Sequence, residues 1–259
     1  MKRSTSRFKH CLALAVFVFV TCAPASAQFA GGMGSTWNNP ISSTISVMIT
    51  GEINEENLKR AVANQKGGAG KSTLSSPAPS PGKSPTQIDA AVRFRPTATP
   101  LKVRAVANQL GTNADEKAQM LALMNKLLKY YEGEAQRLGM PNDFAMALSV
   151  CLAVNSSVFH GTPEPEDAQL IALRNTIAAA MADGGALSNS TDRQKQELYE
   201  AIVRFTMLAE AGYKEARQNG DEGGQTTYRQ LAGINLQAVS GVPPNRAWVT
   251  KDGVRVDPK

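Results

Sequence analysis

The chain has 259 residues, of which 42% are apolar, and its 28 Lys and Arg against 22 Asp and Glu give a net charge of +6. This length allows one sizeable domain or two small ones, and a mean hydropathy of −0.25 argues against a protein built from membrane spans. Three cysteines and two histidines argue against a disulfide scaffold and against a Cys/His metal cluster.

The first 27 residues have the three parts of a cleavable export signal. Basic residues come first, an apolar run covers residues 11–20, and Ala25-Ser26-Ala27 supplies the small side chains that signal peptidase recognises. We therefore expect cleavage after Ala27, a mature chain that begins at Gln28, and a periplasmic or secreted protein. The run is too short for a membrane span, which takes roughly 20 residues, and Thr21 before Cys22 does not favour a lipid anchor.

Removal of this segment changes both the charge and the thiol content. The segment carries four of the 28 basic residues and no acidic residue. The net charge of the mature chain is then only about +2, which no longer indicates nucleic acid as a partner. One thiol, Cys151, and one imidazole, His160, remain. Apolar neighbours favour a buried Cys151 over a reactive one or one paired between chains, and we expect His160 to touch solvent at a helix end.

Residues 28–65 are expected to form an N-terminal arm, and residues 66–92 a linker. The arm has a short β-prone stretch and a possible short helix over residues 54–65, with Asn54 as its cap. The linker is rich in Pro, Gly and Ser, and such a segment buries too little apolar surface to offset its ordering entropy. We therefore expect it to be disordered, with Phe94 as the first residue after it that could dock on a core.

A conspicuous string, NQKGGAGKST, occupies residues 64–73. It resembles the deviant Walker A motif of the ParA/MinD-like ATPases, in which glycine N–H groups hold phosphate. The resemblance implies phosphate contacts for Lys71, a magnesium ligand in Ser72 and a signature lysine in Lys66, around the glycines Gly67, Gly68 and Gly70. Three features disfavour this P-loop nucleotide binder: no buried strand precedes the string, prolines follow where a helix should begin, and no alternation of strands and helices comes later.

Five amphipathic helices are expected between residues 113 and 240. Each begins at a residue that can cap a helix and then shows apolar side chains at helical spacing. The expected starts are Asn113, Asp143, Thr162-Pro163, Thr191 and Asp221. Short loops between these helices predict antiparallel neighbours in one bundle, and the tail, residues 243–259, is expected to form a small β-hairpin that turns at Asp252-Gly253.

Several carboxylates in this region raise the possibility of a cell-wall glycan hydrolase, because glycosidases use two acids across a cleft. Most of them fall in first turns or on polar faces, where the helix dipole and solvation explain acidic residues equally well. The six considered are Glu132, Glu134, Asp143, Glu164, Glu166 and Asp167.

Three short stretches carry a family resemblance. They are residues 141–148 (PNDFAMAL), residues 158–161 (VFHG) and residues 195–200 (KQELYE). Together they resemble a family of uncharacterised exported bacterial proteins with an NDxA helix start and a KQxLYE helix, over about residues 93–240. The resemblance implies an exported helical domain and no known activity.

The sequence therefore predicts an all-α antiparallel bundle of about five helices over residues 93–242, preceded by a disordered arm and linker. We expect a binding or structural protein of the cell envelope, more a non-enzyme than an enzyme, whose partner is an envelope protein or a glycan. We expect no cofactor, no metal, no nucleic acid and no membrane span after cleavage. The hydrolase and the disfavoured nucleotide binder remain as alternatives.

Overall fold

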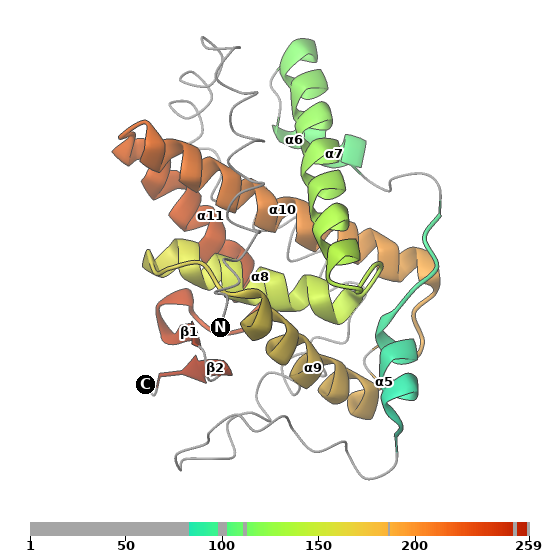
Figure 1. The fold of residues 1–259 in the computed structure, drawn as a ribbon. Coiled ribbons are helices and arrows are strands. Elements are labelled where there is room, and N and C mark those ends of the chain that lie inside the picture. Colours follow the sequence, from blue (N-terminus) through green and yellow to red (C-terminus); the bar gives the residue numbers. More distant parts are fainter. Residues whose placement is uncertain (1–82, 98–102, 111–112, 186, 251–252, 258–259) are drawn as a thin grey trace.

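The computed structural model describes residues 83–97, 103–110, 113–185, 187–250 and 253–257. These residues form an all-α bundle followed by a small antiparallel hairpin (Figure 1), so the predicted fold class is confirmed. The expected signal, the arm and residues 66–82 of the expected linker lie outside the described residues.

The helices follow one another with short connections, and the hairpin comes last. In chain order the elements are α5 (Pro85–Val92), α6 (Val103–Leu110), α7 (Ala114–Arg137), α8 (Phe144–His160), α9 (Asp167–Gly184), α10 (Asp192–Gln218), α11 (Glu222–Ser240), a 3-10 turn (Pro244–Arg246), β1 (Ala247–Thr250) and β2 (Gly253–Val256). The five expected helices correspond to α7–α11.

Most helix ends lie where the capping residues predict them. The Asn113 side chain accepts a hydrogen bond from the Glu116 N–H (2.9 Å) at the start of α7, and Thr191 and Gln194 form a reciprocal capping box at the start of α10. Gly161, with a φ of 68°, ends α8 in the left-handed conformation that glycine adopts without strain. These ends are set by neighbouring residues, which is why the sequence predicts them.

The expected linker is wrong at its C-terminal end, because residues 85–92 form α5. Ser84 and Gln87 make a complete capping box, and Pro85 stands at the first helical position, where its missing N–H has no cost. Phe94 docks on the core as expected, with 6% of its surface exposed. The ordered domain therefore begins before residue 93.

The predicted start of the third helix is also wrong. Thr162 and Pro163 lie in the loop after α8, and α9 begins only at Asp167. Glu166 is the N-cap and forms a capping box with Gln169. Of the acidic residues that suggested an earlier start, Glu164 lies in the loop, Glu166 is the cap, and only Asp167 lies in the first turn.

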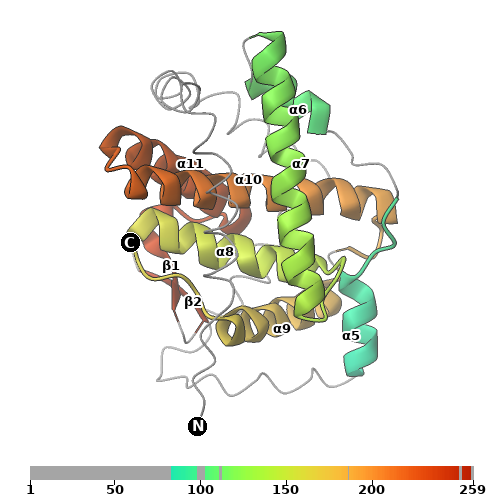
Figure 2. The ribbon, with the colours of Figure 1, turned by 45° about the horizontal axis from the view of Figure 1, so that its top comes forward.

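Helix α8 is the central element of the bundle. Every residue from Phe144 to Val158 is buried, and the helix packs against α9, α10, α11 and β1. Figures 1 and 2 show α7 crossing α8 and α10 on one side, with α5 and the hairpin at opposite ends of the domain. A helix that is apolar on all faces belongs inside a bundle, and in the described residues no helix combines the length and the apolar character needed to cross a membrane.

A polar network joins α8, α10 and α11 inside this apolar core. Asn155 donates to the Thr206 hydroxyl (3.1 Å) and to the Cys151 carbonyl (2.7 Å). Asn235 donates to the Asn155 side-chain oxygen (3.0 Å) and to the Phe205 carbonyl (3.1 Å). Buried polar groups need such partners, so the network favours one register of the three helices. Cys151 is buried as predicted, and burial raises the pKa of its thiol to about 11.

The hairpin covers the C-terminal end of α8. Its strands pair from Ala247–Val256 to Thr250–Gly253, so the predicted hairpin is confirmed, but Gly253 is the first residue of β2 and not a turn residue. His160 lies at the C-terminal end of α8 and is partly exposed, as predicted, and its ring also stacks on Trp248 at 3.4 Å between ring centroids and 11° between planes. Its Nε2 also lies 3.0 Å from the Ala247 carbonyl oxygen. His160 therefore holds the hairpin against the bundle.

Candidate functional site

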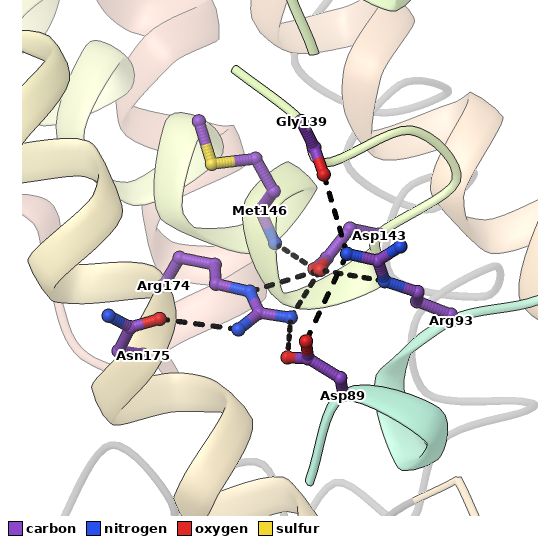
Figure 3. Close-up of polar contacts among 7 residues, drawn as sticks. All are labelled: Asp89, Arg93, Gly139, Asp143, Met146, Arg174 and Asn175. Carbon is purple, nitrogen blue, oxygen red and sulfur yellow. Dashed lines mark hydrogen bonds and ion pairs between the residues drawn. The ribbon is translucent and has the colours of Figure 1, made fainter. Parts of the chain in front are cut away.

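A buried ion-pair cluster lies where α5, α8 and α9 meet (Figure 3). Its centre is Asp143, whose side chain is completely buried. As the N-cap of α8, Asp143 accepts a hydrogen bond from the Met146 N–H at 2.8 Å. Its other oxygen accepts from both Nε (3.0 Å) and Nη2 of Arg174. One carboxylate thus starts α8 and binds a guanidinium on α9.

Arg174 connects this carboxylate to α5. Its side chain is 6% exposed, and Nη2 also donates to Asp89 at 2.7 Å. The guanidinium is further held by Asn175, at 3.2 Å from Nη1. Burial by itself lowers the pKa of Arg174, but hydrogen bonds and attraction from Asp143 and Asp89 raise it overall. Arg174 therefore stays charged between two carboxylates.

Arg93 closes the cluster from its outer side. Its Nε lies 4.0 Å from Asp143 and its Nη2 donates to the Gly139 carbonyl at 3.4 Å. Arg93 and Asp143 also form an isolated antiparallel β-bridge. The cluster contains two arginines and two aspartates, so its charges balance, and both oxygens of Asp143 are occupied. Such an arrangement holds three segments together, and complete burial keeps this carboxylate from contact with a substrate.

A second charged cluster ties the loop between α8 and α9 to α10. The Lys214 ammonium lies 2.8 Å from a Glu164 oxygen and 2.8 Å from a Glu210 oxygen. Glu210 is 2% exposed, and burial raises its pKa although Lys214 acts to lower it. Burial acts to lower the pKa of Lys214, but the two glutamates raise it overall. The ammonium thus lies between the two carboxylates.

A third buried pair lies on α10 itself. Arg204 Nη1 donates to Glu200 at 2.7 Å, and Gln196 donates to the other Glu200 oxygen at 2.7 Å. Beside this pair, Tyr199 makes edge-to-face contacts with Phe94 (5.0 Å) and Tyr131 (5.8 Å). Burial raises the pKa of Tyr199 far above its usual range. The aromatic residue of the KQELYE stretch is therefore part of the core.

The six carboxylates considered from the sequence divide among several places. Asp143 is in the first cluster and Glu164 in the second, whereas Glu134 and Asp167 meet at Arg137, 2.8 Å and 3.0 Å away. Of the remaining two, Glu166 caps α9 and Glu132 is exposed. No three metal-ligating side chains are grouped together within the described residues.

The other sequence-predicted site residues lie outside the part of the chain that the structure describes. These are the Walker-like residues Lys66, Gly67, Gly68, Gly70, Lys71 and Ser72, and the expected cleavage site at Ala27 and Gln28. Both expectations stay predictions.

Arg174 and Asp89 were not predicted as site residues. Arg174 lies four residues after Leu170 and three before Ile177, in the apolar stripe that faces the core. A charged residue at an inward position needs a buried partner, so the position of Arg174 in the sequence could have indicated a buried ion pair. Asp89 carried no such signal, because it belongs to a segment whose composition indicated a linker.

Comparison with known proteins identifies a family. No curated protein and no solved structure matches the chain. One family model matches residues 6–257, a longer stretch than the expected resemblance over residues 93–240, and it includes the Walker-like string. The chain therefore belongs to the family of unknown function DUF6683.

Proposed function

We propose that this chain is an exported binding or structural protein of the cell envelope, with an envelope protein or a glycan as its partner. The export features of residues 1–27 support the location. The helical bundle, held by buried ion pairs and a polar core network, supports a rigid module that presents a fixed surface. The main alternative is a hydrolase of cell-wall glycan.

The occupied carboxylates favour binding over hydrolysis. A glycosidase needs one protonated acid and a second carboxylate, both facing the sugar. Asp143 is buried and held by Arg174. Lys214 lies between Glu164 and Glu210 and forms an ion pair with each, so both carboxylates bind an ammonium instead of facing a sugar. This position of Lys214 is the observation that carries the proposal.

Burial raises the pKa of Glu210 and also that of Glu132, and Glu210 is the more deeply buried of these two acids. A buried carboxyl with a raised pKa is typical of a general acid. Glu210→Gln is therefore the variant that separates the two functions, because the amide keeps the shape of the side chain and cannot release a proton.

The test combines location, binding and hydrolysis. We expect the protein in the envelope fraction, either sedimenting with purified peptidoglycan sacculi or giving a cross-linked adduct with one envelope protein. Dye-labelled sacculi should release no more soluble dye with the wild-type protein than with Glu210→Gln. Dye release by the wild-type protein that disappears in Glu210→Gln would establish the hydrolase, and a purely cytoplasmic protein would contradict the envelope role.

A further inference from the structure

The C-terminal end of α8 lies beside the turn that joins α10 to α11 (Figures 1 and 2). Three elements meet there. Gly161 ends α8, Tyr213 and Arg217 lie in the last turns of α10, and Arg229 lies in the first half of α11. We call these four residues the arginine corner. Gly161 belongs to the VFHG stretch of the sequence, and none of the four takes part in the three charged clusters described above.

Arg229 is held in place by Tyr213 and by the backbone at the end of α8. Its Nη2 donates to the Tyr213 hydroxyl at 2.9 Å, and its Cζ lies 5.4 Å from the centre of the Tyr213 ring. The same Nη2 lies over Gly161, where a Cβ would be only 2.9 Å away from it. Gly161 therefore has two roles, because its φ of 68° ends α8 and its missing side chain leaves room for the guanidinium.

A second guanidinium lies at the same aromatic ring. Arg217 follows Tyr213 by about one turn of α10, and its Cζ lies 5.8 Å from the ring centre. Tyr213 is buried, whereas Arg217 and Arg229 are exposed. Because an aromatic face attracts cations, the ring brings two accessible positive charges together at the surface.

These two charges are not balanced by nearby carboxylates. Among the residues that the structure places, the ion pairs include neither Arg217 nor Arg229. The acids closest to this part of α10 are Glu164 and Glu210, and both bind Lys214. Two like charges that lie near each other repel, and a bound anion would remove this repulsion.

We propose that the arginine corner binds a phosphate group. A guanidinium presents its N–H donors in a planar fork that matches the oxygens of a phosphate. A phosphate monoester carries a charge of about −1.5 to −2 at pH 7, which balances two arginines, whereas a carboxylate balances one. Inorganic phosphate and a sugar phosphate both carry this group, and the test separates them. The inference does not depend on the proposed function, because it uses only the geometry and charge of this corner.

Isothermal titration calorimetry on the full chain tests the site with inorganic phosphate and glucose 6-phosphate as probes. Each of Arg217→Gln and Arg229→Gln should raise the dissociation constant by about tenfold or more, because each removes hydrogen bonds to a charged group. The matched control is Arg193→Gln, which removes an exposed arginine from the first turn of α10 and should leave phosphate binding unchanged. Tighter binding of glucose 6-phosphate than of inorganic phosphate would assign the site to a phosphorylated glycan, and equal binding would assign it to the free ion.

Two further measurements keep the test decisive if Arg229→Gln disturbs the fold. In the isotope-labelled wild-type chain, phosphate should shift the side-chain Nε–H resonances of Arg217 and Arg229 and leave that of Arg193 unchanged. Glucuronate, which carries a carboxylate on the same kind of sugar ring, should bind about tenfold more weakly than glucose 6-phosphate, because it has less charge to balance the two arginines.

Three results would overturn the phosphate site. The first is that neither phosphate probe binds the wild-type chain. The second is that the wild-type chain and a folded Arg217→Gln/Arg229→Gln double variant bind phosphate equally well. The third is that glucuronate binds as tightly as glucose 6-phosphate.

Discussion

Replacing Asp143 with Asn removes the central charge of the buried cluster while keeping the shape of the side chain. Asn caps helices as well as Asp does, so the hydrogen bond from Met146 can remain. Arg174 loses its buried carboxylate and keeps Asp89, which is 45% exposed, as its remaining charged partner. Breaking a buried ion pair costs about 3–5 kcal/mol, and the remaining contact with Asp89 places the expected loss near the lower end. We therefore expect the free energy of unfolding to fall by about 3 kcal/mol.

Urea unfolding followed by far-UV circular dichroism measures this change. Asp143→Ala should cost about 1 kcal/mol more than Asp143→Asn, because the cap is lost as well. Adding Arg174→Met to Asp143→Asn should recover part of the loss, since no unpaired guanidinium then stays buried. Asp115→Asn, an exposed acid in the first turn of α7, is the control and should change stability by less than about 0.5 kcal/mol. A loss below about 1 kcal/mol for Asp143→Asn, with no recovery in the double variant, would refute the reasoning.

Five other outcomes are expected. Leu152→Ala should lower the free energy of unfolding by about 2–5 kcal/mol, because Leu152 is buried in the central helix. The Cys151 thiol, with its pKa raised to about 11, should not react with a thiol reagent at pH 8 until the chain is unfolded. The same group stabilises the fold below a pH of about 8.5, and this contribution should be lost as the pH rises towards the folded pKa, since the unfolded thiol ionises first. N-terminal sequencing of the envelope form should give Gln28 as the first residue. Lys71→Ala should leave the free energy of unfolding unchanged, and isothermal titration calorimetry should detect no binding of Mg-ATP by the wild-type chain.

Each of these outcomes has a clear counter-result. A Leu152→Ala loss below about 1 kcal/mol would mean that the side chain contributes little to packing. Rapid modification of Cys151 in the native protein would mean that solvent reaches the thiol. If the free energy of unfolding did not change up to pH 11, protonation of this thiol would not be linked to folding. A mature chain that still begins at Met1, or ATP binding that disappears in Lys71→Ala, would favour the nucleotide-binding alternative.

The predictable parts of the fold are those set by neighbouring residues. The caps Asn113, Thr191 and Asp221 could be predicted from the sequence. A capping side chain accepts a hydrogen bond from a backbone N–H at most three positions later, so the signal is local. The Ser84–Gln87 capping box of α5 was equally local. It was missed because the composition of the surrounding residues predicts a linker. The composition of a long segment does not reveal a few residues within it that pack on the core.

The candidate site was harder to predict, because its contacts join positions far apart in the chain. Asp143 could be recognised as a cap, but its binding to Arg174 across 31 positions depends on how α9 packs. Inward-facing Arg174 indicated only that some buried acid exists. The separation of two residues along the sequence does not identify the acid that pairs with Arg174. In a helix bundle, the packing of the helices decides which residues meet.

Helix α8 has no face turned to water from Phe144 to Val158, and this limits how the protein can be shortened. Removing α11, for example by ending the chain at residue 221, would uncover apolar surface on α8 that nothing else in the described bundle can cover. Such a fragment should aggregate when expressed and not persist as a smaller domain. The helices that enclose α8 must therefore be kept together in any shortened form of the protein.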